Sequence, residues 1–156
     1  MDLALSYNPT LDAFDISLDV LKADLTAEES LTTAVVLSLL TDRTALASDV
    51  PAGADRRGWW ADTYSDGRDQ FGSRLWLLAR EKQLTQTIVR ARAFVAEALQ
   101  WLIDDGLASA IDVAVFAPRM GWLVAQVDIA LVAGSRRYRF EWADATQQWQ
   151  LAAEVH

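Results

Sequence analysis

The chain contains no cysteine and only one histidine, His156. The absence of cysteine excludes a disulfide framework and a thiolate nucleophile. A lone imidazole at the last position argues against a histidine-based metal site and against a Ser-His-Asp triad. We therefore expect no bound metal, no cofactor and no catalytic residue.

Basic residues are few: 14 Lys and Arg stand against 22 Asp and Glu, a formal net charge of -8. Phosphate groups repel such a chain, so nucleic acid is not an expected partner. No apolar run approaches the roughly 18 residues that a membrane-spanning helix needs. The first residues also lack a basic segment followed by an apolar one. Neither membrane insertion nor a signal peptide is therefore expected.

The first forty residues carry one strand pattern and one helix pattern. Phe14, Ile16 and Leu18 alternate with polar residues, which predicts a short strand or hairpin arm. The stretch from Thr26 to Glu29 matches a capping box, and the run from Leu31 to Leu40 is apolar on nearly every face. We therefore predict a helix that is packed by neighbours on all sides.

Further helices are predicted between residues 73 and 105. Ser73 is a suitable N-cap for a short helix that runs through Trp76 to Lys82. Thr85 caps the longest helix, which is predicted to continue to about Asp105 and to stop at Gly106. Apolar residues three and four positions apart define its core-facing stripe: Ile88, Ala91, Val95, Ala98 and Leu102.

After Gly106 the apolar residues recur at every second position, which indicates β-strands. The alternating runs are 111–115, 123–131 and 138–142, with a last arm around Trp149 and Leu151. A hairpin turn is predicted at Gly134-Ser135. The whole pattern predicts one α+β domain over residues 1–156. An N-terminal strand segment and about three helices are expected to pack on a C-terminal antiparallel meander.

A segment without any helix or strand period spans about residues 44–72. A loop of this length in a compact domain is usually functional or disordered. Its adjacent tryptophans, Trp59 and Trp60, argue against disorder, so we predict a long ordered loop. Neighbouring residues of an extended chain point to opposite sides. One indole is therefore expected to cap the core, and the other to face outward as an interface anchor.

Four strings between about Asp24 and Ile111 carry a family resemblance: Thr33–Arg43 (TAVVLSLLTDR), Asp55–Asp62 (DRRGWWAD), Gly72–Leu78 (GSRLWLL) and Ala98–Leu102 (ALQWL). In this order they resemble the Mu-like prophage baseplate wedge family. That family is similar to the small wedge protein of T-even contractile tails and to the matching baseplate subunit of type VI secretion systems. Relatives carry a Glu-Pro-Arg string whose nearest counterpart here, Ala117-Pro118-Arg119, lacks the Glu. No wedge-anchoring role is therefore transferred to these residues.

The resemblance implies a structural role without enzymatic activity. Such proteins join the baseplate wedge around the end of the tail tube and offer strands near the first sheath ring. The implied partners are larger wedge proteins and tail sheath or tube proteins. The implied location is the virion tail baseplate, and the host cytoplasm during assembly. An isolated copy can also dimerise through surfaces meant for partners. The residues expected at a protein interface are Arg56, Arg57, Gly58, Trp59, Trp60, Asp62, Arg74 and Trp76.

A second interpretation is a cell-wall hydrolase, because the T-even relative has sometimes been called a tail lysozyme. The catalytic residues would then be the loop carboxylates Asp62, Asp66 and Asp69. A glycosidase, however, needs two carboxyl groups about 5–10 Å apart, one with a raised pKa, and the sequence predicts no apolar pocket around them. These carboxylates can instead pair with the arginines of the loop and hold it in place. A third interpretation is a regulatory binding module, since a related bacterial fold acts as an anti-adaptor.

Overall fold

The computed structural model describes residues 5–8, 13–16, 18–19, 24–25, 27–59, 70–80, 85–132, 134–143 and 145–155. The chain divides into two compact units, residues 1–37 and 38–156, and the boundary falls inside helix α1. Each unit is described by itself. The single domain expected from the sequence therefore stays a prediction.

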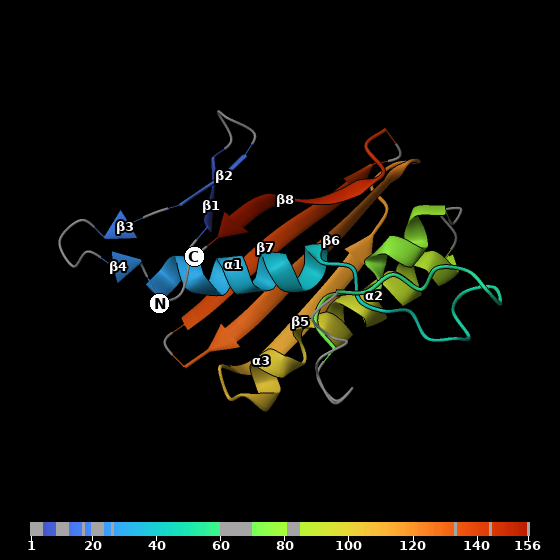
Figure 1. Cartoon of the computed structure of the whole chain (residues 1–156). Helices are drawn as coiled ribbons and strands as arrows, with labels where there is room; N and C mark the ends of the chain where they lie inside the picture. Colours follow the sequence, from blue (N-terminus) through green and yellow to red (C-terminus); the bar gives the residue numbers. More distant parts are fainter. Residues whose placement is uncertain are drawn as a thin grey trace. The chain divides into compact units, whose positions relative to one another are not determined.

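The described part of the first unit contains short strands and most of helix α1 (Ala27–Leu40) (Figure 1). The strands form two antiparallel pairs: β1 (Leu5–Asn8) with β2 (Ala13–Ile16), and β3 (Leu18–Asp19) with β4 (Asp24–Leu25). Helix α1 matches the predicted range, but Leu37 is 43% exposed, so the helix is not packed on all sides. The predicted capping residue Thr26 lies outside the described residues.

Residues 75–105 form a 3-10 helix and two α-helices. The predicted short helix is the 3-10 helix η2 (Leu75–Arg80), and the predicted long helix is divided into α2 (Thr85–Leu99) and α3 (Trp101–Asp104). The division falls where the Gln100 N–H bonds to the Glu97 carbonyl, three residues back, at 3.4 Å. The predicted stop at Gly106 is confirmed. This glycine has φ 74, and the N–H of Leu107 bonds to the Leu102 carbonyl, as in a Schellman cap.

The C-terminal half is an antiparallel sheet in the order β5-β6-β7-β8, which confirms the predicted meander (Figure 1). Its strands are β5 (Ala108–Phe116), β6 (Trp122–Leu131), β7 (Gly134–Ala143) and β8 (Gln148–Val155). The predicted turn at Gly134-Ser135 is wrong. Both residues belong to the ladder of β7, where they pair with Leu131 and Ala130. The described turn residue is instead Val132, before Gly134.

One face of the sheet supplies the core, and α2 packs on it beside β5 and β6. The large side chains buried on this face lie at alternate positions along the strands: Val113, Leu123, Val127, Ile129, Tyr138, Phe140, Trp142 and Leu151. Val124, on the other face of β6, is buried as well, so the alternation is not complete. The stripe of α2 is buried opposite them at Ala91, Val95 and Ala98. On the other face Arg137 donates a hydrogen bond to Asp128, its direct cross-strand neighbour. The α+β class predicted from the sequence is therefore confirmed.

Candidate functional site

Most of the predicted interface residues lie in the described part of the chain: Arg56, Arg57, Gly58, Trp59, Arg74 and Trp76. Trp60 and Asp62 lie outside it, as do Asp66 and Asp69. The structure places the described candidates on two segments, 55–59 and 72–76. Both segments bond to residues 41–45, which follow helix α1. The candidates therefore form one cluster around this short stretch.

The segment 72–76 is fixed to the chain after α1 by backbone hydrogen bonds. Ser73 donates its N–H to the Thr41 carbonyl at 2.8 Å and accepts the Arg43 N–H at 2.9 Å. The buried Ser73 hydroxyl donates to the Leu39 carbonyl at 2.6 Å. Gly72 has φ 98, and a Cβ added there would lie 2.5 Å from the Thr41 carbonyl oxygen. Only glycine fits at this position.

The segment 55–58 is attached to the same stretch through Ala45 and Thr44. The Ala45 N–H donates to the Arg56 carbonyl at 2.9 Å, and the Arg56 side chain returns a bond from Nε to the Ala45 carbonyl at 2.6 Å. Gly58 has φ 119, and a Cβ there would lie 2.0 Å from Thr44 Oγ1. Arg56 and Gly58 therefore hold the turn in place.

Arg57 occupies the centre of this turn in a left-handed conformation, with φ 51. Its N–H donates to Asp55 Oδ1 at 2.9 Å, which supports the turn. Its guanidinium lies 4.6 Å above the Trp76 ring and donates to Asp42 Oδ2 at 2.8 Å. The indole N–H of Trp76 in turn donates to the Arg43 carbonyl at 2.9 Å. Arg57 and Trp76 are thus held against each other by contacts on both sides.

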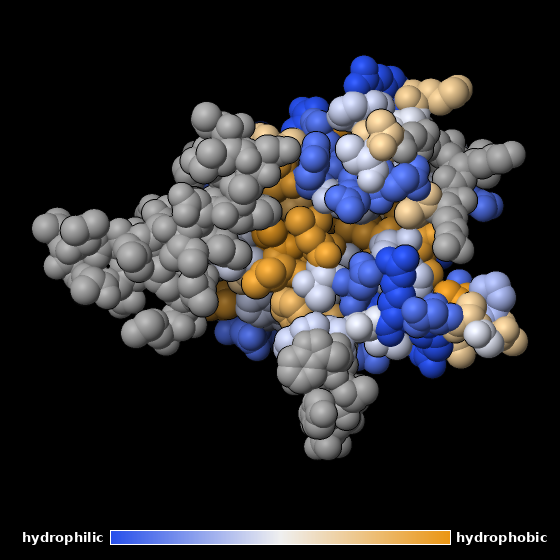
Figure 2. Space-filling model, turned by 45° about the horizontal axis from the view of Figure 1, so that its top comes forward, coloured by the Kyte–Doolittle hydropathy of each residue, from blue (hydrophilic) through white to orange (hydrophobic). Residues whose placement is uncertain are grey.

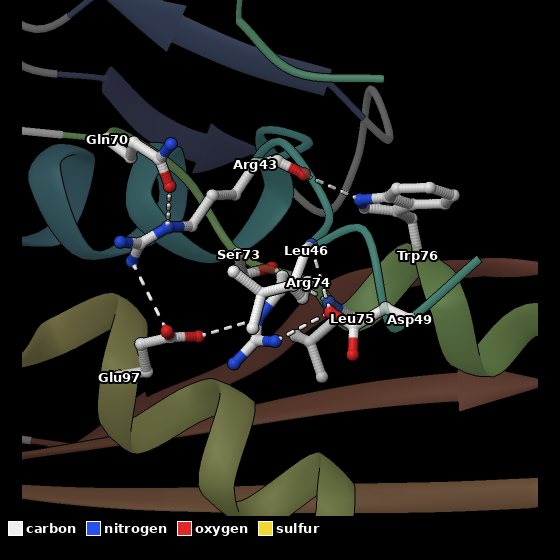
Figure 3. Close-up of polar contacts among 9 residues, drawn as sticks. All are labelled: Arg43, Leu46, Asp49, Gln70, Ser73, Arg74, Leu75, Trp76 and Glu97. Atoms are coloured by element: carbon white, nitrogen blue, oxygen red, sulfur yellow. Dashed lines mark hydrogen bonds and ion pairs between the residues drawn. The ribbon is translucent and has the colours of Figure 1, made fainter. Parts of the chain in front are cut away.

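Arg74 lies between two carboxylates from different elements (Figure 3). It donates from Nη1 to Asp49 Oδ2 at 2.7 Å and from Nε to Glu97 Oε2 at 2.9 Å. Its guanidinium also covers the Phe94 ring at 4.6 Å. The side chains of Arg74 and Asp49 are only 15% and 16% exposed, so solvent screens this pair weakly. Arg74 is therefore a structural link between the loop, η2 and α2.

Arg43 extends the same network on the other side of Glu97 (Figure 3). Its Nη1 lies 3.9 Å from Glu97 Oε1, and its Nε donates to Gln70 Oε1 at 3.3 Å. The loop arginines were expected to pair with Asp62, Asp66 and Asp69, which lie outside the described residues, so this pairing stays a prediction. Among the described residues, the carboxylates that meet Arg57 and Arg74 are Asp42, Asp49 and Glu97. These partners lie 15 to 25 residues away along the chain, which local sequence patterns do not reveal.

Burial and hydrogen bonding act in opposite directions on the pKa of Asp49. Burial by itself raises this pKa, but the hydrogen bonds from Arg74 and from the Leu46 N–H lower it below its ordinary value of 3.8. For Arg74, burial by itself lowers the pKa, and the hydrogen bonds to Asp49 and Glu97 raise it above its ordinary value. Both shifts favour the charged pair, so the folded state stabilises the ionised forms.

The lowered pKa of Asp49 predicts a loss of stability in acid. A carboxyl group whose pKa is lower in the folded state contributes stability above its unfolded pKa, near 3.8, and loses it as the pH falls through the folded pKa. Asp49→Asn should therefore lower the urea midpoint at about pH 7, and this difference should shrink at about pH 3. Asp112→Asn, which changes an exposed carboxylate without a hydrogen bond or ion pair in the described chain, should alter the midpoint little. If Asp49→Asn lowered the urea midpoint as much in acid as at neutral pH, the lowered pKa of Asp49 in the folded state would be contradicted.

The tryptophans differ in burial. Trp142 is buried, whereas Trp76 and Trp101 are only half-buried. The Trp101 N–H donates to the Ser38 hydroxyl at 3.1 Å. Trp59 is 41% exposed, and its ring lies 5.5 Å from that of Phe71. Trp59 therefore combines a packed edge with an exposed surface.

The described residues give this cluster little catalytic character. The pKa of Asp49 and that of Asp128 are lowered, whereas a glycosidase acid needs a raised one. Within the described ranges no three His, Cys, Asp or Glu side chains come together to hold a metal ion. The described helices also lack the length and apolar character needed to cross a membrane. What the cluster provides is a fixed surface with an arginine and two tryptophans, suited to binding.

The range of a matching family model covers the described residues of this cluster. The family described as "Phage protein GP46" matches residues 31–136, which include the segments 41–45, 55–59 and 72–76. The chain is 48% identical over 136 residues to "Baseplate protein gp46" of Escherichia phage Mu, covering 86% of this chain and 90% of that protein. It is 38% identical over 122 residues to "Mu-like prophage FluMu protein gp46" of Haemophilus influenzae, covering 76% and 84%.

These matches cover most of this chain and most of each relative, and they confirm the resemblance to Mu-like baseplate proteins that the sequence strings suggested. Neither relative's name describes an enzyme. The chain therefore belongs to the phage protein GP46 family of Mu-like baseplate proteins.

Proposed function

We propose that this chain is a non-enzymatic structural subunit of a contractile-tail baseplate. The observation that carries the proposal is its 48% identity, over 86% of the chain, to a protein named as a baseplate protein of phage Mu. The arginine network supports it, since the charged groups of the loop are used to fix backbone segments rather than to perform chemistry. Its location is the virion tail baseplate, reached after assembly in the host cytoplasm.

Within the baseplate, we place the chain in the wedge around the tail tube, in contact with larger wedge proteins and with sheath or tube proteins. Two kinds of surface support this placement. The segments 55–59 and 72–76 present Trp59 and Arg57 from a fixed backbone. Strands β5 and β8 form the two edges of the sheet, and in the described chain no further strand pairs with either. Unpaired edges are ready docking sites for a strand of another chain.

Trp59→Ala is expected to weaken assembly more than folding. A half-exposed tryptophan contributes about 1–2 kcal/mol to folding through its packed edge, but truncation of an interface anchor costs about 2–4 kcal/mol of binding. The affinity for the larger wedge proteins should therefore fall at least about 30-fold, with only a small decrease in the urea midpoint. Pull-down titration and urea denaturation of the same preparations measure the two effects.

The matched control is Met120→Ala, which removes a large apolar side chain that is exposed on the turn between β5 and β6. This variant should bind as tightly as the unmodified chain. Parallel losses of stability and of binding in Trp59→Ala would show a folding defect and contradict the interface role. If Trp59→Ala bound the larger wedge proteins as tightly as Met120→Ala, the interface role would be contradicted as well.

A further inference from the structure

A cavity of about 590 Å³ lies beside the arginine cluster in the second unit. Its walls come from the end of α1, from residues 42 and 57, from η2, and from the β7–β8 turn with the strand ends on each side. Three indoles line it, those of Trp76, Trp142 and Trp149, together with leucine side chains. Cavities of about 300–1,000 Å³ with mostly apolar walls and a few polar groups are typical binding sites. Figure 2 shows, on one face of the molecule, apolar surface gathered beside strongly hydrophilic residues.

Two of these indoles have an unused hydrogen-bond donor. The N–H groups of Trp76 and Trp101 find acceptors at Arg43 and Ser38. By contrast, the indoles of Trp142 and Trp149 make no hydrogen bond in the part of the chain that the structure describes, although Trp142 is only 4% exposed. A buried donor without an acceptor destabilises the folded chain. An occupant of the cavity that supplies an acceptor would relieve this cost at Trp142.

The same cavity is bordered by backbone held in an unfavourable conformation. Arg57 (φ 51) and Gln147 (φ 55) are the non-glycine residues with positive φ in the described ranges, and both line it. For Gln147 the hairpin between β7 and β8 explains the conformation, because a left-handed residue is common in such turns. Arg57 lies in no hairpin. Non-glycine residues held in this conformation cluster at ligand clamps, and here the residue so held is the arginine that lines the cavity together with three indoles.

We propose that this cavity binds an extended segment of a partner protein that inserts a bulky apolar side chain and places an adjacent carboxylate on Arg57. The inference rests on the assembly role proposed above and names the chemistry of the partner. The indoles and leucines accept the apolar side chain. The N–H groups of Trp142 and Trp149 donate hydrogen bonds to carbonyl oxygens of the segment. The guanidinium of Arg57 binds the carboxylate.

Arg57 is the basic side chain among the residues that line this cavity. It is already bonded to Asp42, so a carboxylate of the partner would compete with Asp42 for the guanidinium. The side chains of Arg57 and Asp42 are 47% and 42% exposed, and exposed pairs of this kind contribute little. Arg57 can therefore turn from Asp42 to a partner carboxylate at small cost. Its planar guanidinium suits such a pair.

Short peptides test the proposal on the full chain. A pool of capped heptapeptides carries Leu, Ile, Phe, Trp or Met at the centre, followed by Glu, and matched pools carry Gln or Lys in place of the Glu. Binding is followed by the indole N–H signals in ¹H–¹⁵N NMR spectra, assigned with Trp142→Phe and Trp149→Phe. We expect the Glu pool to shift both signals. The Gln pool should bind at least fivefold more weakly, and the Lys pool more weakly still.

Three variants show which charge controls binding. Arg57→Met should weaken binding of the Glu pool at least tenfold, while Asp42→Asn should strengthen it severalfold by releasing Arg57. Arg119→Met is the matched control, because Arg119 also covers an indole, Trp122 at 4.1 Å, but lies outside this cavity. It should leave binding unchanged. No indole shift at millimolar peptide, preference for the Lys pool, or weaker binding by Asp42→Asn would each overturn the proposal.

The peptide experiment and the assembly experiment fail independently. Peptide binding requires no baseplate protein, so a complex that forms with larger wedge proteins while the peptides do not bind would reject this cavity alone. Peptide binding without any complex would reject the wedge role alone. If the peptides bind and the complex also forms, the Glu pool should displace the larger wedge protein. A complex that persists in the presence of bound peptide would show that the wedge protein does not occupy this cavity.

Discussion

Replacing Gly72 by alanine is expected to lower the free energy of unfolding by at least about 2 kcal/mol, because the backbone there combines positive φ with a close contact. An added Cβ would lie 2.5 Å from the Thr41 carbonyl oxygen and 3.2 Å from the Arg43 nitrogen. Both are backbone atoms of the bonded pair of segments, so neither can rotate away. Relief would require breaking the hydrogen bonds between Ser73 and the chain after α1. Urea denaturation followed by circular dichroism measures the loss.

The control for Gly72 is Gly53→Ala. Gly53 also has positive φ, 81, but an added Cβ would meet nothing within 4 Å. Only the conformational strain remains, about 1 kcal/mol. The difference between the two variants isolates the contact with Thr41. Equal losses would mean that the close approach of the two segments contributes nothing, and the account of this junction would be wrong.

Arg74→Met is expected to be the most damaging change of a charged residue in this cluster. It keeps most of the apolar stem over Phe94 but leaves Asp49 without its ion-pair partner at 16% exposure. Breaking a buried pair from one side costs about 3–5 kcal/mol, and partial exposure should reduce this to roughly 2–3 kcal/mol. The urea midpoint at neutral pH should fall accordingly. Adding Asp49→Asn should restore part of the loss, since the stranded charge is then removed.

Arg57→Met provides the matched comparison. Arg57 also pairs with an aspartate and covers an aromatic ring, but its side chain is about half exposed. Exposed pairs contribute about 1 kcal/mol or less, so this variant should remain nearly as stable as the unmodified chain. If the urea midpoint of Arg57→Met were as low as that of Arg74→Met, the distinction between Arg74 as a structural residue and Arg57 as a binding residue would be contradicted.

Patterns that depend on near neighbours predicted much of the fold. Alternation of apolar residues predicted strands β5 to β7, and Gly106 marked a helix stop, because each signal acts within a few residues. The predicted helix up to Asp105 missed the interruption at Gln100, since no residue there disfavours a helix. The turn at Gly134-Ser135 was misplaced because glycine also fits the start of a strand, where Gly134 has φ 141.

The candidate site was predicted only in part, because its contacts join distant segments. The sequence singled out Arg57, Arg74 and Trp76, but gave no sign that their partners are Asp42, Asp49 and Glu97. Glu97 lies in α2, 23 residues along the chain from Arg74. The sequence does not predict the cavity for the same reason, because Trp142 and Trp149 lie far from Trp76 along the chain. Their approach to Trp76 depends on the hairpin β7–β8.

The wedge role is tested most directly by co-expressing the chain with the two larger wedge proteins expected beside it in a tail gene cluster. Size-exclusion chromatography with mass detection then reports whether they form a complex. We predict co-elution at the mass of a defined hetero-oligomer, and loss of that species with Trp59→Ala but not with Met120→Ala. Elution of the chain alone, as a monomer or homodimer beside folded partners, would contradict the proposed assembly role.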